Sequence, residues 1–348
     1  MTDGRGPNGS VEGAAEAPAV DLSVDLAPTN PRELRMANPI IAASGCFGYG
    51  QEYAGVIDVQ RLGAFVSKGV TPEPRRGNPM PRIAESPAGM LNAIGLQNPG
   101  IRGFVKKYPR LWATWRVPAL VNISAESVED YAMMAAVLDE QPGIAGIEVN
   151  VSCPNVARGG YCFGWDAEMS AEVTRAVRAA TTLPVIVKLS PGAVDVVGVA
   201  LAVEEAGADA VSLINTLVGM AIDVKRRRPV LANVTGGVSG PAIKPIALRM
   251  VYQVAAAVRV PVIGMGGIMG LEDALEFFLA GASAVQVGTA IFAQPGMVIR
   301  LIDELEAWMV KEGVGALAEI VGGAQPANGR SEVGAGAPDL VLGAVAAG

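Results

Sequence analysis

The feature that most constrains the fold of this chain is a series of eight short apolar runs, rich in β-branched residues and bounded by Gly, Pro or polar residues. The runs are residues 38–44, 64–68, 118–124, 146–152, 184–190, 208–216, 261–267 and 282–289. Amphipathic stretches at 127–140, 167–181, 195–207 and 271–281 lie between them and have the character of helices. Eight strands alternating with helices predict an α/β fold, a (β/α)8 TIM barrel, with a doubly wound sheet as the alternative.

Two connections, 69–117 and 217–260, are too long to be a single helix. We expect long loop insertions over the C-terminal mouth of the barrel, and an irregular course for the first, which is crowded with Pro, Gly and Asn. Residues 1–22 lack any apolar periodicity and are predicted to be a disordered tail. The barrel is then a single domain over 23–321, followed by a Gly- and Ala-rich tail over 322–348.

Composition excludes several classes of protein. A formal net charge of -7 argues against a nucleic-acid surface. No apolar run approaches the roughly 20 residues that span a bilayer, and the first residues lack the apolar core of a signal peptide. The sequence therefore predicts a cytoplasmic protein with no membrane partner and no nucleic-acid partner.

The absence of histidine removes His general bases, His metal ligands and Ser-His or Cys-His pairs. Cys153 stands where a strand-like run meets a Gly-rich loop, and four roles compete for it: core residue, disulfide half, metal ligand or reactive thiol. The chain has only three cysteines, an odd number, and a cytosolic redox state disfavours a disulfide. Three thiols without histidine also cannot complete a zinc or iron–sulfur site, so we expect no metal site on this chain.

Seven of the eight runs end in polar residues or glycines, and the other ends beside a cysteine. The residues at these ends are Ser44, Lys68, Asn122, Asn150 with Cys153, Lys188, Asn215 with Thr216, Gly266 with Gly267, and Gly288 with Thr289. A single polar residue at a strand end is usually a turn former or a helix cap. In a barrel, however, all eight ends meet at one face, where the active site lies, so their convergence predicts a site.

The glycines after the last two runs can bring backbone N–H groups close to a phosphate, as barrels commonly do. GMGGIMG is not a dinucleotide fingerprint, because Met269 occupies the third glycine position, and by itself it is equally compatible with a tight turn. A barrel phosphate site suggests a mononucleotide cofactor such as a flavin, or a phosphorylated substrate. Lys188 could form a Schiff base or place charge beside a flavin or phosphate, and Lys68 raises the same choice. Asparagines at 92, 122, 150, 155 and 215 suit a planar, amide-rich ligand such as a uracil-like ring.

A set of motifs then resembles a known family. The motifs are NPMPRIAESPAGMLNAIGLQNPG, SCPNVARGGYCFGWD, VKLSP, INT, ANVTGGVSGPAIKP, GMGGI and VGTA. Together, from about Asn38 to about Leu305, they resemble the dihydroorotate dehydrogenases, in particular the catalytic subunit of the soluble NAD-linked class (class 1B). The resemblance implies an FMN-binding barrel that oxidises (S)-dihydroorotate to orotate in de novo pyrimidine (UMP) biosynthesis.

The resemblance also implies roles for individual residues. Cys153 would be the general base that removes the C5 proton while hydride passes from C6 to FMN N5, with Lys68 and Lys188 as further catalytic residues. FMN contacts are implied for Ser44, Lys68, Asn122, Asn150, Lys188, Ile214, Gly240, Gly266, Gly267, Gly288 and Thr289. Substrate contacts are implied for Lys68, Asn92, Ala93, Ile94, Gly95, Leu96, Asn150, Asn215 and Thr216.

The class further implies a partner subunit that carries FAD and a [2Fe–2S] cluster and passes electrons to NAD, in a heterotetramer built on a homodimer of this chain. The quinone-using membrane class uses serine at the position of Cys153, which disfavours it here. Three alternatives stay open: the fumarate-using soluble class, a barrel lyase with Lys188 as Schiff base, and a catalytically silent scaffold.

Overall fold

The computed structural model describes residues 20–152, 154–155 and 161–326. The predictions made for Cys153, for residues 1–19 and for residues 327–348 lie outside this range. Eight parallel strands close a barrel, in the order β11-β12-β17-β18-β3-β4-β7-β8. They are β3 (Ile40–Ala42), β4 (Ala64–Val66), β7 (Ala119–Ile123), β8 (Gly146–Asn150), β11 (Val185–Lys188), β12 (Ala210–Leu213), β17 (Val262–Met265) and β18 (Ala284–Val287). Each lies within one of the eight apolar runs, so the predicted (β/α)8 barrel is confirmed.

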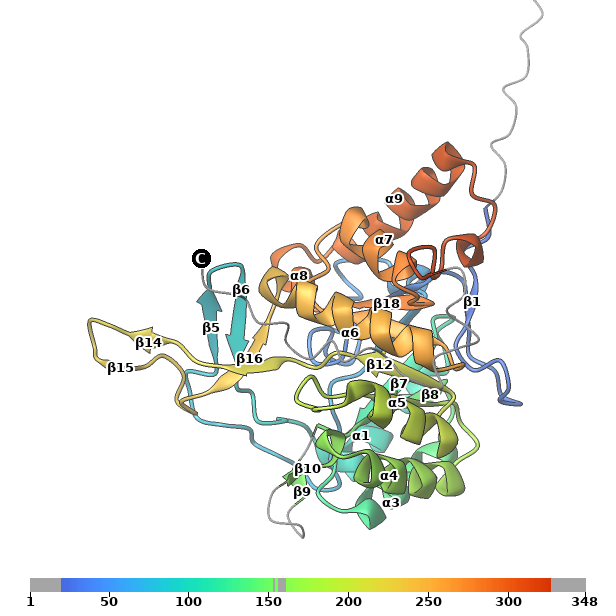
Figure 1. Cartoon of the computed structure of the whole chain (residues 1–348). Coiled ribbons are helices and arrows are strands. Elements are labelled where there is room, and N and C mark those ends of the chain that lie inside the picture. Colours follow the sequence, from blue (N-terminus) through green and yellow to red (C-terminus); the bar gives the residue numbers. More distant parts are fainter. Residues whose placement is uncertain (1–19, 153, 156–160, 327–348) are drawn as a thin grey trace, which may run out of the picture.

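Helices surround the barrel (Figure 1). They are α1 (Gly100–Lys107), α2 (Pro109–Trp112), α3 (Val128–Asp139), α4 (Ala167–Ala180), α5 (Val196–Glu205), α6 (Lys244–Ala257), α7 (Leu271–Leu279), α8 (Ala290–Ala293) and α9 (Met297–Glu312). Short polar side chains fix where three of them begin, because Ser127, Asp166 and Asp195 accept hydrogen bonds from the first turns of α3, α4 and α5. The apolar faces of the helices and the outer faces of the strands form the larger hydrophobic core.

The inside of the barrel changes from apolar to polar along its axis. A second apolar cluster contains Ile41, Leu120, Ile186 and Ile263 from the strands. It also contains residues of the segment that includes the hairpin of β1 (Val24–Asp25) and β2 (Arg35–Met36), which closes the N-terminal end. Nearer the C-terminal ends of the barrel strands, the buried polar residues are Asn122, Glu148, Lys188, Ser212 and Gln286. The polar side chains are therefore gathered toward the C-terminal mouth.

The two long connections lie over the C-terminal mouth, as predicted, but the first does not follow an irregular course. Strands β5 (Ile83–Ser86) and β6 (Gly89–Asn92) from the first connection join β13 (Leu217–Gly219) and β16 (Gly236–Ser239) from the second in one antiparallel sheet, ordered β13-β16-β6-β5. We call it the insertion sheet. The expectation of an irregular course was wrong, because this pairing joins segments far apart in the sequence. Two shorter ladders complete the described strands, β9 (Pro154–Asn155) with β10 (Tyr161–Cys162) and β14 (Ile222–Asp223) with β15 (Arg228–Pro229).

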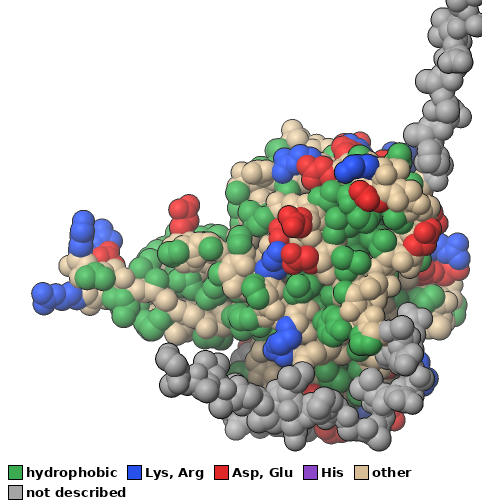
Figure 2. Space-filling model, turned by 45° about the horizontal axis from the view of Figure 1, so that its top comes forward, with side chains coloured by type: hydrophobic (Ala, Val, Ile, Leu, Met, Phe, Trp, Pro, Cys, Tyr) green, Lys and Arg blue, Asp and Glu red, His purple; other side chains and the backbone are tan. Residues whose placement is uncertain are grey.

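The β14–β15 hairpin extends the second connection into an arm that stands away from the barrel (Figure 1). We call residues 217–230 the arm. Val218, Ile222 and Val224 expose most of their side chains there, and Lys and Arg side chains gather at its tip (Figure 2). Such exposure of large apolar side chains is typical of a surface that meets another protein.

The folded chain extends slightly past both expected domain boundaries. Asp21 exchanges backbone hydrogen bonds with Gly315 and Leu317, at 2.8 and 2.9 Å. Beyond residue 321, Gly322 donates to the carbonyl oxygen of Phe278 at 2.9 Å, and the side chain of Gln325 donates to two backbone carbonyls. Within the described ranges, no helix is long and apolar enough to cross a membrane.

Candidate active site

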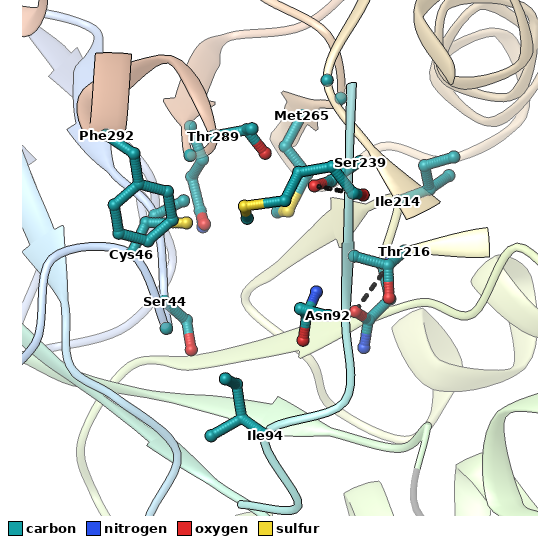
Figure 3. A pocket seen from close by; sticks show the side chains of 18 of the residues that line it. Ser44, Cys46, Asn92, Ile94, Ile214, Thr216, Ser239, Met265, Thr289 and Phe292 are labelled. Carbon is teal, nitrogen blue, oxygen red and sulfur yellow. Dashed lines mark hydrogen bonds between the residues drawn. The ribbon is translucent and has the colours of Figure 1, made fainter. Parts of the chain in front are cut away.

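A cavity of about 540 Å³ opens at the C-terminal ends of the barrel strands, beneath the four-stranded sheet. Its volume lies within the range of about 300–1,000 Å³ that is usual for small-molecule sites. Figure 3 shows Ser44, Asn92, Thr216 and Thr289 reaching it from different segments of the chain. The cavity therefore lies where the sequence placed the active site.

Every described residue of the predicted FMN and substrate sets lines this cavity. They are Ser44, Lys68, Asn92, Ala93, Ile94, Gly95, Leu96, Asn122, Asn150, Lys188, Ile214, Asn215, Thr216, Gly240, Gly266, Gly267, Gly288 and Thr289. Cys153, the predicted base, lies outside the described residues. The structure thus brings together residues from all eight strand ends and from the first insertion, and their individual roles stay predictions.

The floor of the cavity is a hydrogen-bonded group centred on Glu148, in the middle of β8. Its carboxylate accepts from Asn122 Nδ2 at 2.7 Å, Gln286 Nε2 at 2.7 Å and Ser212 Oγ at 3.0 Å. Lys188 Nζ lies 3.8 Å from Glu148 Oε2. Lys188 keeps 8% of its side chain exposed and Glu148 none, so this ion pair sits at the boundary between the barrel interior and the cavity.

Glycines form one wall of the cavity because side chains would not fit there. Gly240, Gly266 and Gly267 have φ angles of +95°, +129° and +80°. A Cβ atom would lie 2.7 Å from Gly89 Cα at Gly240 and 2.8 Å from Ala247 Cβ at Gly266. This wall exposes backbone to the cavity beside the start of α6, an arrangement that suits a phosphate group.

Amides and a lysine form another part of the cavity lining. Asn215 Nδ2 donates to Asn150 Oδ1 at 3.3 Å, so two predicted substrate contacts support each other. Asn92 lies in the insertion sheet and also lines the cavity, and its Nδ2 is 3.4 Å from the carbonyl oxygen of Gly237 on the neighbouring strand of that sheet. Burial and the nearby Arg82 lower the pKa of Lys68, whereas Glu52 acts in the opposite direction. Lys68 therefore loses its proton at a lower pH than an exposed lysine does.

Cys46 is a thiol in this cavity that the sequence did not single out. Burial raises the pKa of Cys46 to about 11, although the positive charge of Lys188 opposes the shift. It is therefore a protonated thiol near neutral pH and a poor candidate for a base. Cys162, to which the sequence assigned no role, is buried, and its thiol donates to the carbonyl oxygen of Val151 at 3.3 Å.

Sequence reasoning also missed Glu148 and Gln286. Both stand within apolar runs, GIEVN and AVQV, where a strand buried on both faces gives no alternation to show which side chain points inward. The available signal was the presence of an acid in such a run, because buried acids are almost always paired. Among the described residues, no group of three or more His, Cys, Asp or Glu could hold a metal ion.

The donor set fits a flavin nucleotide. Gln286 is 1% exposed, and its Oε1 has no hydrogen-bond partner among the described residues although Gln286 lines the cavity. An N–H donor on a planar ring would satisfy that oxygen, the glycine wall suits a phosphate, and Lys188 supplies positive charge at the floor. Fold and site together define a (β/α)8-barrel enzyme with a cavity built for a phosphorylated, amide-rich planar ligand.

Comparison with known proteins gives the family. The family model described as dihydroorotate dehydrogenase matches residues 27–309. The chain is 55% identical over 302 residues to the "Dihydroorotate dehydrogenase B (NAD(+)), catalytic subunit" of Pelobacter propionicus, which covers 87% of this chain and 98% of that protein. It is 53% identical over 305 residues to the protein of the same name from Geobacter metallireducens, covering 88% and 98%. The protein of that name from Desulforamulus reducens is 54% identical over 292 residues, covering 84% and 96%. This chain belongs to the dihydroorotate dehydrogenase family.

Proposed function

We propose that this chain is the catalytic subunit of an NAD-linked dihydroorotate dehydrogenase, which oxidises (S)-dihydroorotate to orotate in pyrimidine biosynthesis. The observation that carries the proposal is the single cavity lined by every described residue of the predicted flavin and substrate sets. The names of the relatives, which are more than 50% identical to this chain over nearly their whole length, support the same reaction.

Membership of this family implies a flavin, and we propose that the flavin is FMN. FMN, when bound, accepts the hydride that leaves the substrate. The glycine wall and Thr289 would hold the phosphate through backbone N–H groups, as small residues after the last two strands do in other barrels. Lys188 would hold positive charge beside the ring, where it favours the reduced, more negative form of the cofactor.

The substrate would lie between the flavin and the insertion sheet. Asn150, Asn215 and the segment Asn92–Leu96 carry paired donors and acceptors that suit the cyclic amide groups of dihydroorotate. Lys68 would bind its carboxylate, since a half-buried ammonium is a strong partner for an anion. These contacts would also hold the ring in one orientation, so that a single face of it meets the flavin.

Cys153 is proposed as the base that takes the C5 proton while the C6 hydride leaves. This assignment rests on the SCPN motif, because Cys153 lies outside the described residues. Cys46, a thiol that does line the cavity, is a poor candidate for the base, since burial raises its pKa to about 11. A thiol with an ordinary pKa of about 8.5 forms more thiolate as the pH rises, so the rate should increase on the alkaline side of neutrality.

We propose that NAD is reached through a partner subunit that carries FAD and a [2Fe–2S] cluster, in a heterotetramer built on a homodimer of this chain. The words "catalytic subunit" in the relatives' names support a separate electron-transfer subunit. Val218, Ile222 and Val224, exposed on the arm, support a protein contact. A cytoplasmic location stays a prediction.

The test begins with the absorption spectrum of the purified chain. We expect the bands of oxidised flavin, which dihydroorotate should bleach under anaerobic conditions. The isolated chain should then reduce an artificial acceptor but neither NAD nor fumarate. A colourless protein, or a flavin that dihydroorotate leaves oxidised, would refute the proposed reaction. Fumarate reduction would indicate the fumarate-using class, and efficient NAD reduction by the chain alone would refute the partner.

The lyase alternative is disfavoured by the position of Lys188. A Schiff base requires a neutral amine, whereas Lys188 Nζ lies 3.8 Å from a fully buried carboxylate. Borohydride treatment in the presence of substrate should therefore leave Lys188 unmodified. An adduct on Lys188 in a protein without flavin would support the lyase instead.

A further inference from the structure

Glu148 is a buried acid that the proposed reaction does not use. It is fully buried in the strand that also carries Asn150, and it does not line the cavity. Burial of a carboxylate is costly unless it is paired and hydrogen-bonded. Glu148 meets this requirement with three hydrogen-bond donors and the ammonium of Lys188. Three of these four partners, Asn122, Gln286 and Lys188, line the cavity themselves.

The carboxylate decides which way two cavity amides face. An ionised carboxylate only accepts hydrogen bonds, so Asn122 and Gln286 must both turn their NH2 groups toward Glu148. Their carbonyl oxygens are then left for other partners. For Gln286 this oxygen is buried and has no partner among the described residues. A buried acceptor of this kind calls for a donor from whatever fills the cavity.

We propose that Glu148 is a positioning residue that sets the hydrogen-bond polarity and the charge of the cavity floor for the flavin. It orients Asn122 and Gln286 so that their amide oxygens face the cavity. These oxygens can accept a hydrogen bond from a ring N–H group but cannot donate one to a ring carbonyl. Glu148 also offsets part of the positive charge that the ammonium of Lys188 places beside the ring. This inference rests on the proposed function, because it assigns the ligand at the floor as the flavin ring.

The charge balance has a measurable consequence. Loss of the Glu148 charge would leave Lys188 uncompensated beside the flavin. The extra positive charge would stabilise the reduced flavin, which is more negative than the oxidised form, and the reduction potential would rise. Replacing the Glu148 carboxylate with an amide would also weaken FMN binding. The new NH2 group would face the NH2 group of Asn122, so the Asn122 side chain would have to turn and present its NH2 group, instead of its oxygen, to the flavin.

Three variants test the proposal. Glu148→Gln removes the charge and inverts the polarity at Asn122 with little change in volume. Ser212→Ala is the matched control, because it removes one hydrogen bond to the same carboxylate from a residue that does not line the cavity. Adding Asn122→Asp to Glu148→Gln reverses donor and acceptor across the 2.7 Å contact and returns one negative charge to the floor.

The measurements are the dissociation constant of FMN from the apoprotein and the reduction potential of the bound flavin, determined against redox dyes without dihydroorotate. In Glu148→Gln we expect FMN to bind at least about tenfold more weakly, a difference of about 1.4 kcal/mol. We also expect the ratio of reduced to oxidised flavin at a fixed potential to rise about tenfold, or about 30 mV for a two-electron couple. For Ser212→Ala, both the FMN dissociation constant and the ratio of reduced to oxidised flavin should stay within about twofold of the values for the unmodified protein. For the double variant, both should stay within about threefold.

Unchanged affinity and potential in Glu148→Gln would overturn the proposal, and so would equal effects of Ser212→Ala. If Glu148→Gln does not fold, the double variant decides: FMN binding near the unmodified value supports the proposal, and a folded double variant that has lost FMN refutes it. Because neither measurement uses dihydroorotate, a flavoprotein that fails to oxidise this substrate would sink the proposed reaction while the role of Glu148 is judged separately.

Discussion

Gly267 offers a quantitative test of the glycine wall. Its φ angle is +80°, and a Cβ atom there would lie 2.7 Å from Lys244 Cβ and 3.0 Å from the carbonyl oxygen of Gly240. Lys244 cannot move aside easily, because it begins α6 and its ammonium binds Asp273 at 2.6 Å and Glu276 at 3.0 Å. Gly267→Ala should therefore disturb both the backbone and its surroundings.

The size of the effect follows from three terms. A left-handed backbone costs a residue other than glycine about 1–2 kcal/mol. Overpacking against a fixed neighbour costs about 1–3 kcal/mol. Alanine also lowers the conformational entropy of the unfolded chain, which stabilises the folded state by about 0.4–1 kcal/mol. The free energy of unfolding should thus fall by about 1–5 kcal/mol.

Gly270→Ala is the matched control, in the same loop and one residue before α7. Its φ angle is -175°, an ordinary extended value, and nothing lies within 4 Å of an added Cβ. Urea unfolding of the apoproteins and FMN titration by fluorescence quenching would compare the two variants. Gly267→Ala should also weaken FMN binding by about tenfold or more, because the displaced backbone N–H groups would no longer reach the phosphate. Equal unfolding midpoints and equal FMN affinities for the two variants would refute this account of the wall.

Further predictions concern the thiols, Lys68 and the arm. Cys153→Ser should keep FMN but slow flavin reduction by dihydroorotate by orders of magnitude near pH 7, and an unchanged stopped-flow rate would exclude Cys153 as the base. Because burial raises the pKa of Cys46 to about 11, little thiolate forms at pH 8, so iodoacetamide should label this thiol far more slowly in the folded apoprotein than in the unfolded chain. Orotate affinity should fall as the pH rises through the lowered pKa of Lys68 and become weak and pH-independent in Lys68→Met; an unchanged pH profile in that variant would contradict this. The double variant Val218→Asp, Val224→Asp should dissociate the proposed heterotetramer, as measured by analytical ultracentrifugation, without loss of bound FMN. Both side chains are more than 80% exposed in the isolated chain, so the substitutions should not disturb its fold. An intact heterotetramer would place the interface elsewhere.

Much of the barrel could be predicted from local sequence. Each of the eight strands lies in a run such as PVIVKLS or ASAVQVGT, in which apolar residues on both faces require cover on both sides. The polar residues that follow those runs reach the cavity because parallel strands in a barrel end at one face. Position along the strand was therefore enough to find Ser44, Lys188 and Thr289.

The insertion sheet could not be predicted in the same way. β6 pairs with β16 through contacts such as Leu91 with Val238. The two strands are individually short and are interrupted by glycines, so neither carries a strong local signal. Each strand is stabilised by pairing with the other, and the sequence of one segment does not indicate a partner so far away in the chain.

The sequence by itself determined the order of strands and helices, the polar strand ends and the family, since these depend on residue type and spacing. Only the tertiary structure decided which buried side chains meet inside the barrel. Glu148 and Gln286 are separated by 138 positions in the chain, yet their side chains lie 2.7 Å apart. Barrel closure brings them together, because β8 and β18 contribute inward-facing residues at the same height. The direction in which the cavity amides face is thus a property of the closed barrel and not of any one segment.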